Sequence, residues 1–256
     1  MLVDNKFFYI SIPRTGTMSF HISCFKNNID IKYVDARYDN INQFKYIPDS
    51  SLIKDTYTLS THLRHGHETI SQLQQKFGNN FEIIAVRRNK YERFISSWNH
   101  IITHIERLKV NDYKEIIKIL SELDENEIFD FNNEILNIEN LTPPGSNYSI
   151  SNFFLNKFNI KIPNHKEHFL NKALWWQYVP TSYYHQNHSK IIWFDFEKLY
   201  ELEDWVSNKL NMDFKLEKIN SSKHIKSNLK VTDNFIKKYD NIYNKFDTIK
   251  TSKSIL

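Results

Sequence analysis

Nine residues near the start of the chain, "IPRTGTMSF", combine the groups that bind phosphate in proteins. Gly16 allows backbone N–H groups to point at an anion. Arg14 adds a permanent positive charge, and hydroxyl donors come from Thr15, Thr17 and Ser19. Because the apolar run "KFFYIS" precedes them, we expect a strand, a turn and a helix whose N-terminus favours anions. The stretch predicts a phosphate cradle, and the alternative is an ordinary turn before a Ser/Thr-capped helix.

The positions of the glycines exclude two common nucleotide-binding motifs. An ATP-type P-loop needs two glycines five residues apart, followed by lysine. The chain has only four glycines, at positions 16, 66, 78 and 145. No pair has the P-loop spacing, and G-x-G-x-x-G is excluded by the same positions. A typical P-loop NTPase or kinase and a nicotinamide enzyme are therefore not expected.

A second stretch, "IIAVRRNKYERFISSW", also ends a predicted strand in a turn and a helix. Arg87 and Arg88 stand at the end of the strand, and Ser96 lies about two helical turns further on. An arginine and a serine in this arrangement can hold one phosphate together. The alternative is a solvated arginine pair and a surface serine.

Three histidines, His62, His65 and His67, fall within "LSTHLRHGHE" after another predicted strand. A metal site is one reading, although cysteine partners are absent and the segment is not H-E-x-x-H. Capping and surface histidines are a second reading. The third is catalysis, because a histidine with a pKa near 6.5 is suited to act as a general base at neutral pH.

The elements that must position these residues alternate between strands and helices. Apolar runs rich in β-branched and aromatic residues predict strands at 7–11, 31–35, 57–61, 81–86 and 190–194. Helical patterns cover 17–27, 68–77, 90–108, 113–123, 151–158, 199–210 and 231–246. This order predicts an α/β fold, a single domain over residues 1–256 with a central parallel sheet flanked by helices. Such sheets bind ligands at the carboxyl ends of their strands, where the turn, the histidines and the arginines would lie.

Two of the helices carry clear internal signals. In the segment 90–108, Phe94 and Trp98 begin an apolar stripe at spacings of three and four, and Asn89 is a candidate N-cap. In the segment 231–246, Val231, Phe235, Tyr239, Ile242 and Phe246 form a similar stripe.

Composition restricts the class of protein. The 256 residues are 40% hydrophobic, and the net charge of +4 is too small to indicate nucleic acid as a partner. Residues 215–256 hold ten lysines and four acidic residues, which predicts either a solvated helix face or an anion-binding surface. Cys24 is the only cysteine, so an intrachain disulfide is excluded. No apolar run reaches the roughly 18 residues of a membrane span, and no signal-sequence pattern opens the chain.

Taken together, the two candidate phosphate stretches resemble motifs of the sulfotransferases that use 3′-phosphoadenosine 5′-phosphosulfate (PAPS). "PRTGTMSF" is similar to the 5′-phosphosulfate loop P-K-T-G-T-T-S-L, and "RNKYERFISSW" is similar to the 3′-phosphate motif R-x-P-x-x-R-x-x-S. Arginine here replaces the loop lysine, Met18 replaces a threonine and Lys90 replaces the proline. The resemblance assigns the first phosphate site to Arg14, Thr15, Gly16, Thr17, Met18 and Ser19, and the second to Arg88 and Ser96, with Arg93 as the inner arginine of the motif.

Other segments resemble the family more weakly. "IIWFDFEKLYELEDWV" is similar to its late strand and acidic-Leu segment, and the C-terminal part is similar to the membrane-type, carbohydrate-modifying branch. "THL" is similar to the K-T-H segment of the cytosolic branch, which implies that His62 is the general base and leaves His65 and His67 as nearby substitutes and Glu68 as a remoter one. No motif is placed in residues 109–171.

The resemblance implies transfer of a sulfuryl group from PAPS to a hydroxyl acceptor, with a saccharide expected, and without a metal or nucleic acid. Arg14 would stabilise the leaving phosphate, and the turn after the first strand would be a P-loop-like phosphosulfate site. The expected location is the cytoplasm, for an enzyme of bacterial or viral origin, or the chain is one trimmed of its membrane anchor. Two alternatives stay open: a nucleotide or small-metabolite kinase with an atypical loop, and a non-catalytic protein that binds 3′,5′-adenosine bisphosphate (PAP).

Overall fold

The computed structural model describes residues 1–34, 68–108, 113–129, 159, 181–185, 188–218 and 226–241. The predicted strand at 57–61, the predicted helix at 151–158 and His62, His65 and His67 lie outside these residues. Contacts divide the chain into two compact units, Met1–Arg88 with Thr181–Ile219 and Asn89–Pro180 with Asn220–Leu256. Such units occur within single domains as well as between domains, so the single domain stays a prediction.

The first unit contains a five-stranded sheet in the order β3-β1-β2-β4-β5. Its strands are β1 (Leu2–Val3), β2 (Phe7–Ile10), β3 (Ile31–Lys32), β4 (Glu82–Arg87) and β5 (Ile191–Asp195). β2 pairs parallel with β4, and β4 pairs parallel with β5. β1 runs antiparallel to both β2 and β3. The α/β fold is confirmed, but the sheet is mixed where a parallel sheet was predicted.

The mixed character of the sheet comes from a tight turn that was not predicted from the sequence. Asp4 and Asn5 have φ angles of 48° and 51°, and the N–H of Lys6 donates to the carbonyl of Val3 at 2.8 Å. Two consecutive positive φ angles at Asp and Asn are typical of a type I′ hairpin turn, which reverses the chain between antiparallel strands. This turn adds the short strand β1 to the sheet.

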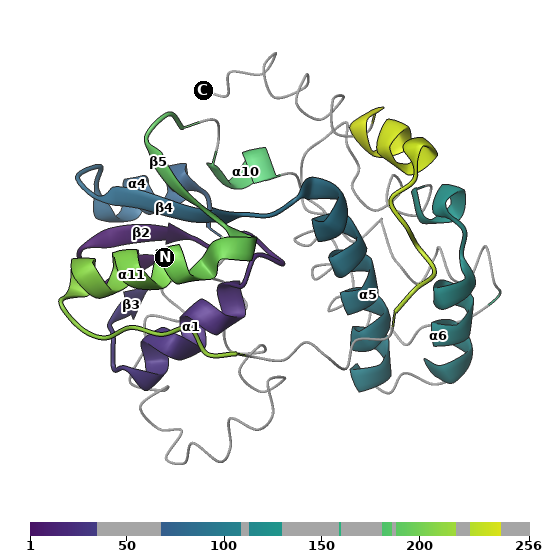
Figure 1. The fold of residues 1–256 in the computed structure, drawn as a ribbon, viewed down its shortest axis with the longest axis horizontal. Coiled ribbons are helices and arrows are strands. Elements are labelled where there is room, and N and C mark those ends of the chain that lie inside the picture. Colours follow the sequence, from purple (N-terminus) through teal and green to yellow (C-terminus); the bar gives the residue numbers. More distant parts are fainter. Residues whose placement is uncertain are drawn as a thin grey trace. The chain divides into compact units, whose positions relative to one another are not determined.

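Helices cover both faces of the sheet (Figure 1). Because side chains alternate along a strand, Phe7 and Tyr9 of β2 face one side and Phe8 faces the other. Tyr9 stacks on Phe20 of α1 (Thr17–Lys26), with ring centroids 4.0 Å apart, and this core also takes in the apolar face of α11 (Leu199–Leu210). On the opposite side, Phe8 contacts Phe77 of α4 (Ile70–Phe77). All four residues of β2 are buried, so the strand is fixed beneath the turn that follows it.

The second unit is helical in the described residues. It contains α5 (Lys90–Leu108), α6 (Tyr113–Glu122) and the helical residues 125–129 and 233–241. The predicted N-cap is confirmed, because Asn89 Oδ1 accepts hydrogen bonds from the N–H groups of Tyr91 and Glu92 at 3.0 and 3.2 Å. Phe94 and Trp98 are buried as the apolar stripe predicts.

The start of the last helix differs from its prediction. Val231 was placed in the apolar stripe, but it is exposed and precedes the helical residues. The helix begins later because Thr232 Oγ1 accepts the N–H of Phe235 at 3.0 Å, which is the hydrogen bond of an N-cap. Phe235 and Tyr239 are buried as predicted, and they pack with Phe94 and Phe129. Among the described residues, no helix has the length and apolar character needed to span a membrane.

Candidate functional site

The turn between β2 and α1 holds two residues in the left-handed region of backbone space. Arg14 has φ 66°, and Gly16, the N-cap of α1, has φ 84° and ψ 7°. Gly16 adopts this conformation without steric cost, whereas an L-residue such as Arg14 pays roughly 1–2 kcal/mol. Backbone that alternates between right- and left-handed conformations forms concave nests of N–H groups that bind anions. The turn therefore has the geometry of a candidate anion site at the carboxyl end of β2.

The two threonine hydroxyls of this turn bond to the chain itself. Thr15 Oγ1 and Thr17 Oγ1 both donate to the carbonyl of Ile12, each at 2.8 Å. Because both hydroxyls bond to the same carbonyl, these bonds fix the shape of the turn. From the sequence, these hydroxyls were expected to face a phosphate. In this geometry, the backbone N–H groups of the turn and of the first turn of α1 are the more direct candidate donors.

Met18 and Ser19 lie in the first turn of α1, and both are half-buried. The carbonyl of Ser19 accepts a hydrogen bond from the Ser23 hydroxyl at 2.8 Å. Contacts of these two residues with a phosphate stay a prediction. Both residues lie close to the N-cap of α1, which is the position that such contacts require.

The adjacent arginines at the end of β4 take different partners. Arg87 donates to both carboxylate oxygens of Asp195, at 2.5 and 3.4 Å. The two residues are paired in the parallel register of β4 and β5. Hydrogen bonding to Arg87 lowers the pKa of the Asp195 carboxyl, and the same contact raises the pKa of the guanidinium. Arg87 is thus engaged in an exposed ion pair between neighbouring strand ends.

Arg88 is directed to the candidate anion site. Its Nη1 donates to the carbonyl of Arg14 at 3.3 Å, so the structure brings the first and second sequence motifs together. The Arg88 guanidinium also lies over the ring of Phe196, with its central carbon 4.6 Å from the ring centroid. Phe196 opens the short 3-10 helix η3 (Phe196–Lys198) directly after β5.

Phe196 also lies against the glycine of the turn. A Cβ built at Gly16 would be 3.7 Å from Phe196 Cε2 and 3.7 Å from Leu199 Cδ1. Phe196 was not predicted from the sequence as a site residue. Its position in the sequence could have indicated a role in the site, because Phe196 follows the predicted strand at 190–194. It therefore falls at the same carboxyl edge of the sheet as the turn.

Ser96 and Arg93, the remaining residues of the second motif, belong to α5 in the other compact unit. Ser96 is half-buried, and Arg93 is buried with 1% of its surface exposed. The residues that the structure brings together within the first unit are therefore Arg14, Gly16 and Arg88. His62, the predicted general base, lies outside the described residues.

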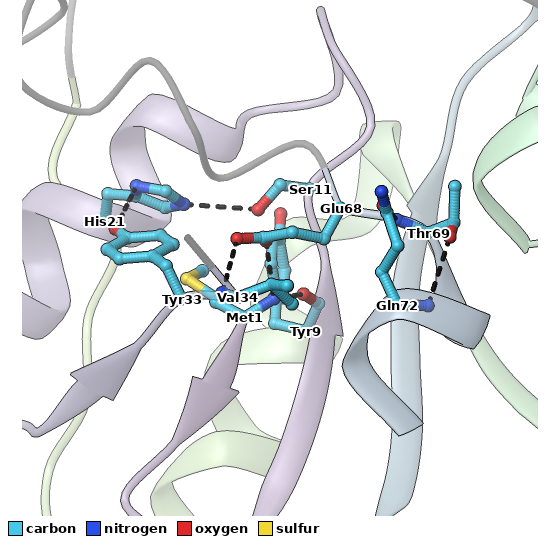
Figure 2. Close-up of polar contacts among 9 residues, drawn as sticks. All are labelled: Met1, Tyr9, Ser11, His21, Tyr33, Val34, Glu68, Thr69 and Gln72. Carbon is cyan, nitrogen blue, oxygen red and sulfur yellow. Dashed lines mark hydrogen bonds and ion pairs between the residues drawn. The ribbon is translucent and has the colours of Figure 1, made fainter. Parts of the chain in front are cut away.

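Figure 2 shows a buried polar network that includes residues on both sides of the turn, Ser11 and His21. Ser11, at the end of β2, has its Oγ 3.2 Å from Nε2 of His21 in α1, and the other ring nitrogen lies 3.1 Å from the Tyr33 hydroxyl. Glu68 accepts the N–H of Val34 at 3.0 Å and lies 3.4 Å from the amino group of Met1. These contacts join the segments on both sides of the turn to β3 and to the segment before α4.

The Ser11–His21–Tyr33 arrangement resembles a nucleophile, a base and an orienting group in spacing. However, Ser11 is 0% exposed and His21 is 3% exposed. No acceptor can reach a fully buried hydroxyl, so we interpret the arrangement as support for the turn. Burial raises the pKa of the Tyr33 phenol well above its ordinary value, so the phenol stays protonated even in alkaline solution. The sequence analysis missed His21, although its place four residues after Thr17 puts both on one side of α1.

Within the described ranges, no group of three or more His, Cys, Asp or Glu side chains is arranged to hold a metal ion. Cys24 is buried in the core, and burial raises the pKa of its thiol well above the ordinary value. The thiol is therefore a packing group at neutral pH.

Comparisons of the chain with protein-family models, with curated proteins and with solved structures found no match. The fold and the site together identify the chain as an α/β protein with a glycine-containing turn after a buried strand. The turn has two left-handed residues and an arginine from the neighbouring strand bound to its backbone.

Proposed function

We propose that the chain is a sulfotransferase that binds PAPS at the β2–α1 turn and transfers its sulfuryl group to a hydroxyl acceptor. The observation that carries the proposal is the contact between the two motifs. Arg88 donates to the carbonyl of Arg14, inside a turn whose left-handed residues 14 and 16 can direct N–H groups to an anion. The spacing of the glycines argues against a typical P-loop NTPase or kinase, so a kinase with an atypical loop is the alternative that stays open.

The proposed chemistry moves one sulfuryl group in line. The acceptor oxygen forms a bond to sulfur, while the bond between sulfur and the bridging phosphate oxygen breaks. PAP leaves with that electron pair, and the acceptor proton passes to a general base. Negative charge grows on the 5′-phosphate of PAP as it leaves. Arg14 and the N–H groups of the turn would stabilise this charge.

The other roles follow the resemblance of the motifs. Arg88 and Ser96 would bind the 3′-phosphate of the nucleotide, and His62 would accept the proton, with His65 and His67 as the other candidates. A saccharide is the proposed acceptor. Parallel alanine variants of the three histidines test the base, because loss of a positioned base typically reduces the rate by about 10²–10⁴-fold.

A thermal-shift comparison of PAP, AMP and ATP, each with and without EDTA, tests the proposal. PAP should raise the melting temperature more than AMP, because only PAP carries the second phosphate, and EDTA should not change the result. A ligand at about 100 times its Kd adds about 2.7 kcal/mol to the free energy of unfolding. Stabilisation by ATP that depends on Mg²⁺, without an effect of PAP, would instead support the kinase alternative. PAP binding without transfer to any acceptor would support the non-catalytic one.

A further inference from the structure

We infer that Phe196 is a positioning residue, which holds the Arg88 guanidinium against the β2–α1 turn and so presets the affinity for the 3′-phosphate. The inference rests on the proposed function, since it concerns how that nucleotide is held. It starts from the position of one ring. The Phe196 ring centroid lies 4.6 Å from the central carbon of the Arg88 guanidinium, and the ring is also near Gly16, where a built Cβ would be 3.7 Å from it.

The ring limits the freedom of the arginine. Arginine is a long side chain with several rotatable bonds, so a ligand that binds it must normally order it first. The face of Phe196 attracts the guanidinium electrostatically, and the carbonyl of Arg14 accepts one of its N–H groups. A guanidinium has five N–H donors in a fixed plane, so a bond to the backbone also fixes the orientation of that plane. Pre-ordering of this kind raises affinity by lowering the cost of binding.

The neighbouring residue explains why Arg88, and not Arg87, is held at the turn. Asp195 and Phe196 are consecutive at the end of β5, and Arg87 and Arg88 are consecutive at the end of β4. The register pairs Asp195 with Arg87 in an ion pair. The next residue along each chain then brings Phe196 to Arg88. The dipeptide Asp195–Phe196 therefore gives the two arginines different partners: Arg87 forms a salt bridge, and Arg88 is held at the candidate site.

The test compares Phe196→Leu with Phe196→Tyr by calorimetric titration with PAP and with AMP. Phe196→Leu removes the aromatic face but keeps an apolar side chain beside Gly16, whereas Phe196→Tyr keeps the face. Phe194→Leu is the matched control, because Phe194 is a buried core residue two positions upstream in β5. Arg88→Ala is measured alone and together with Phe196→Leu.

We expect Phe196→Leu to weaken PAP binding by about 3- to 30-fold, the range that corresponds to one cation–π contact. AMP binding should change little, because AMP lacks the 3′-phosphate. Phe196→Tyr should restore the PAP affinity, Phe194→Leu should leave it unchanged, and Phe196→Leu should have no further effect in the Arg88→Ala background.

Three outcomes would overturn the inference. The first is an unchanged PAP affinity in Phe196→Leu. The second is an equal loss of affinity for PAP and for AMP in that variant. The third is a loss of PAP affinity from Phe196→Leu that is as large in the Arg88→Ala background as in the wild type. Each of them leaves the proposed function in place, because the wild-type chain still binds PAP. If the wild-type chain does not bind PAP at all, the proposed function fails, and the role of Phe196 in ligand binding fails with it.

Discussion

At the scale of single residues, Arg14 and Gly16 hold left-handed backbone on either side of Thr15. Strained backbone of this kind persists only where the surrounding structure enforces it, and here the two threonine bonds to Ile12 and the Arg88 contact do so. The presence of Gly16 and its role in a turn could be predicted from sequence. The left-handed Arg14 could not, because it depends on those tertiary contacts.

Gly16→Ala should weaken PAP binding, because the positive φ of residue 16 is strained for alanine. The space at the site is not the obstacle, since the nearest atoms would be 3.7 Å from the new Cβ. Gly78→Ala is a matched control, because Gly78 also has a positive φ of 90° and has no atom within 4 Å of a built Cβ. Both variants should lose stability in chemical denaturation, Gly16→Ala by roughly 1–2 kcal/mol and Gly78→Ala by roughly 1–3 kcal/mol, because Gly78, with ψ 175°, lies in a region that essentially only glycine adopts. Only Gly16→Ala should lose PAP affinity; an equal loss in Gly78→Ala would mean that the effect is not local to the turn.

The two arginines provide a second residue-level test. Arg88→Ala should weaken PAP binding by about one to two decades in Kd, since a hydrogen bond to a charged group is worth about 1.5–3 kcal/mol. Arg87→Ala should bind PAP normally, because Arg87 is engaged by Asp195 in an exposed pair. Its effect should instead appear in the NMR titration of Asp195, whose pKa is lowered by Arg87 and should return toward the ordinary value. The reverse pattern of affinities would show that the wrong arginine has been assigned.

At the scale of elements, local signals predicted most of the helices and strands. The strand–turn–helix at the start, the helix capped by Asn89 and the helix at 199–210 all carry strong periodicity or caps, and the structure contains them. Strand β1 was missed because two apolar residues give no periodic pattern, and its pairing depends on the turn at Asp4 and Asn5. The boundary at Val231 was misplaced because the apolar spacing suggested a stripe, whereas the cap at Thr232 sets the start.

The cap of α5 yields a prediction at this scale. Asn89→Ala removes the acceptor of the N–H groups of Tyr91 and Glu92, so the free energy of unfolding should fall by about 1 kcal/mol. Asn89→Asp keeps an acceptor oxygen and should retain most of the stability. Asn208→Ala, at an exposed position within α11, is the control and should be neutral or slightly stabilising. Urea denaturation measures all three variants; if Asn89→Ala matched the wild type, the cap would carry no weight in this chain.

At the scale of the whole molecule, the sequence predicted an α/β fold with its phosphate-binding residues at strand ends, and the first unit of the structure has that arrangement for the turn and Arg88. Phe196 could not be assigned from local pattern, because its partners Gly16 and Arg88 are distant in the sequence and meet only through the order of β2, β4 and β5. The contacts of Phe196 in the candidate site thus depend on the pairing between strands, which local periodicity does not encode.

The central claim is that the nucleotide binds at the β2–α1 turn, and an NMR titration of the ¹⁵N-labelled chain with PAP tests it most directly. We predict that the largest backbone amide shifts occur at residues 14–19, because the N–H groups of the turn and of the first turn of α1 would donate to the 5′-phosphate. The same amides should move less with adenosine, which has no phosphate. If PAP binds while the amides of residues 14–19 stay unchanged, or if PAP does not bind, the account is contradicted.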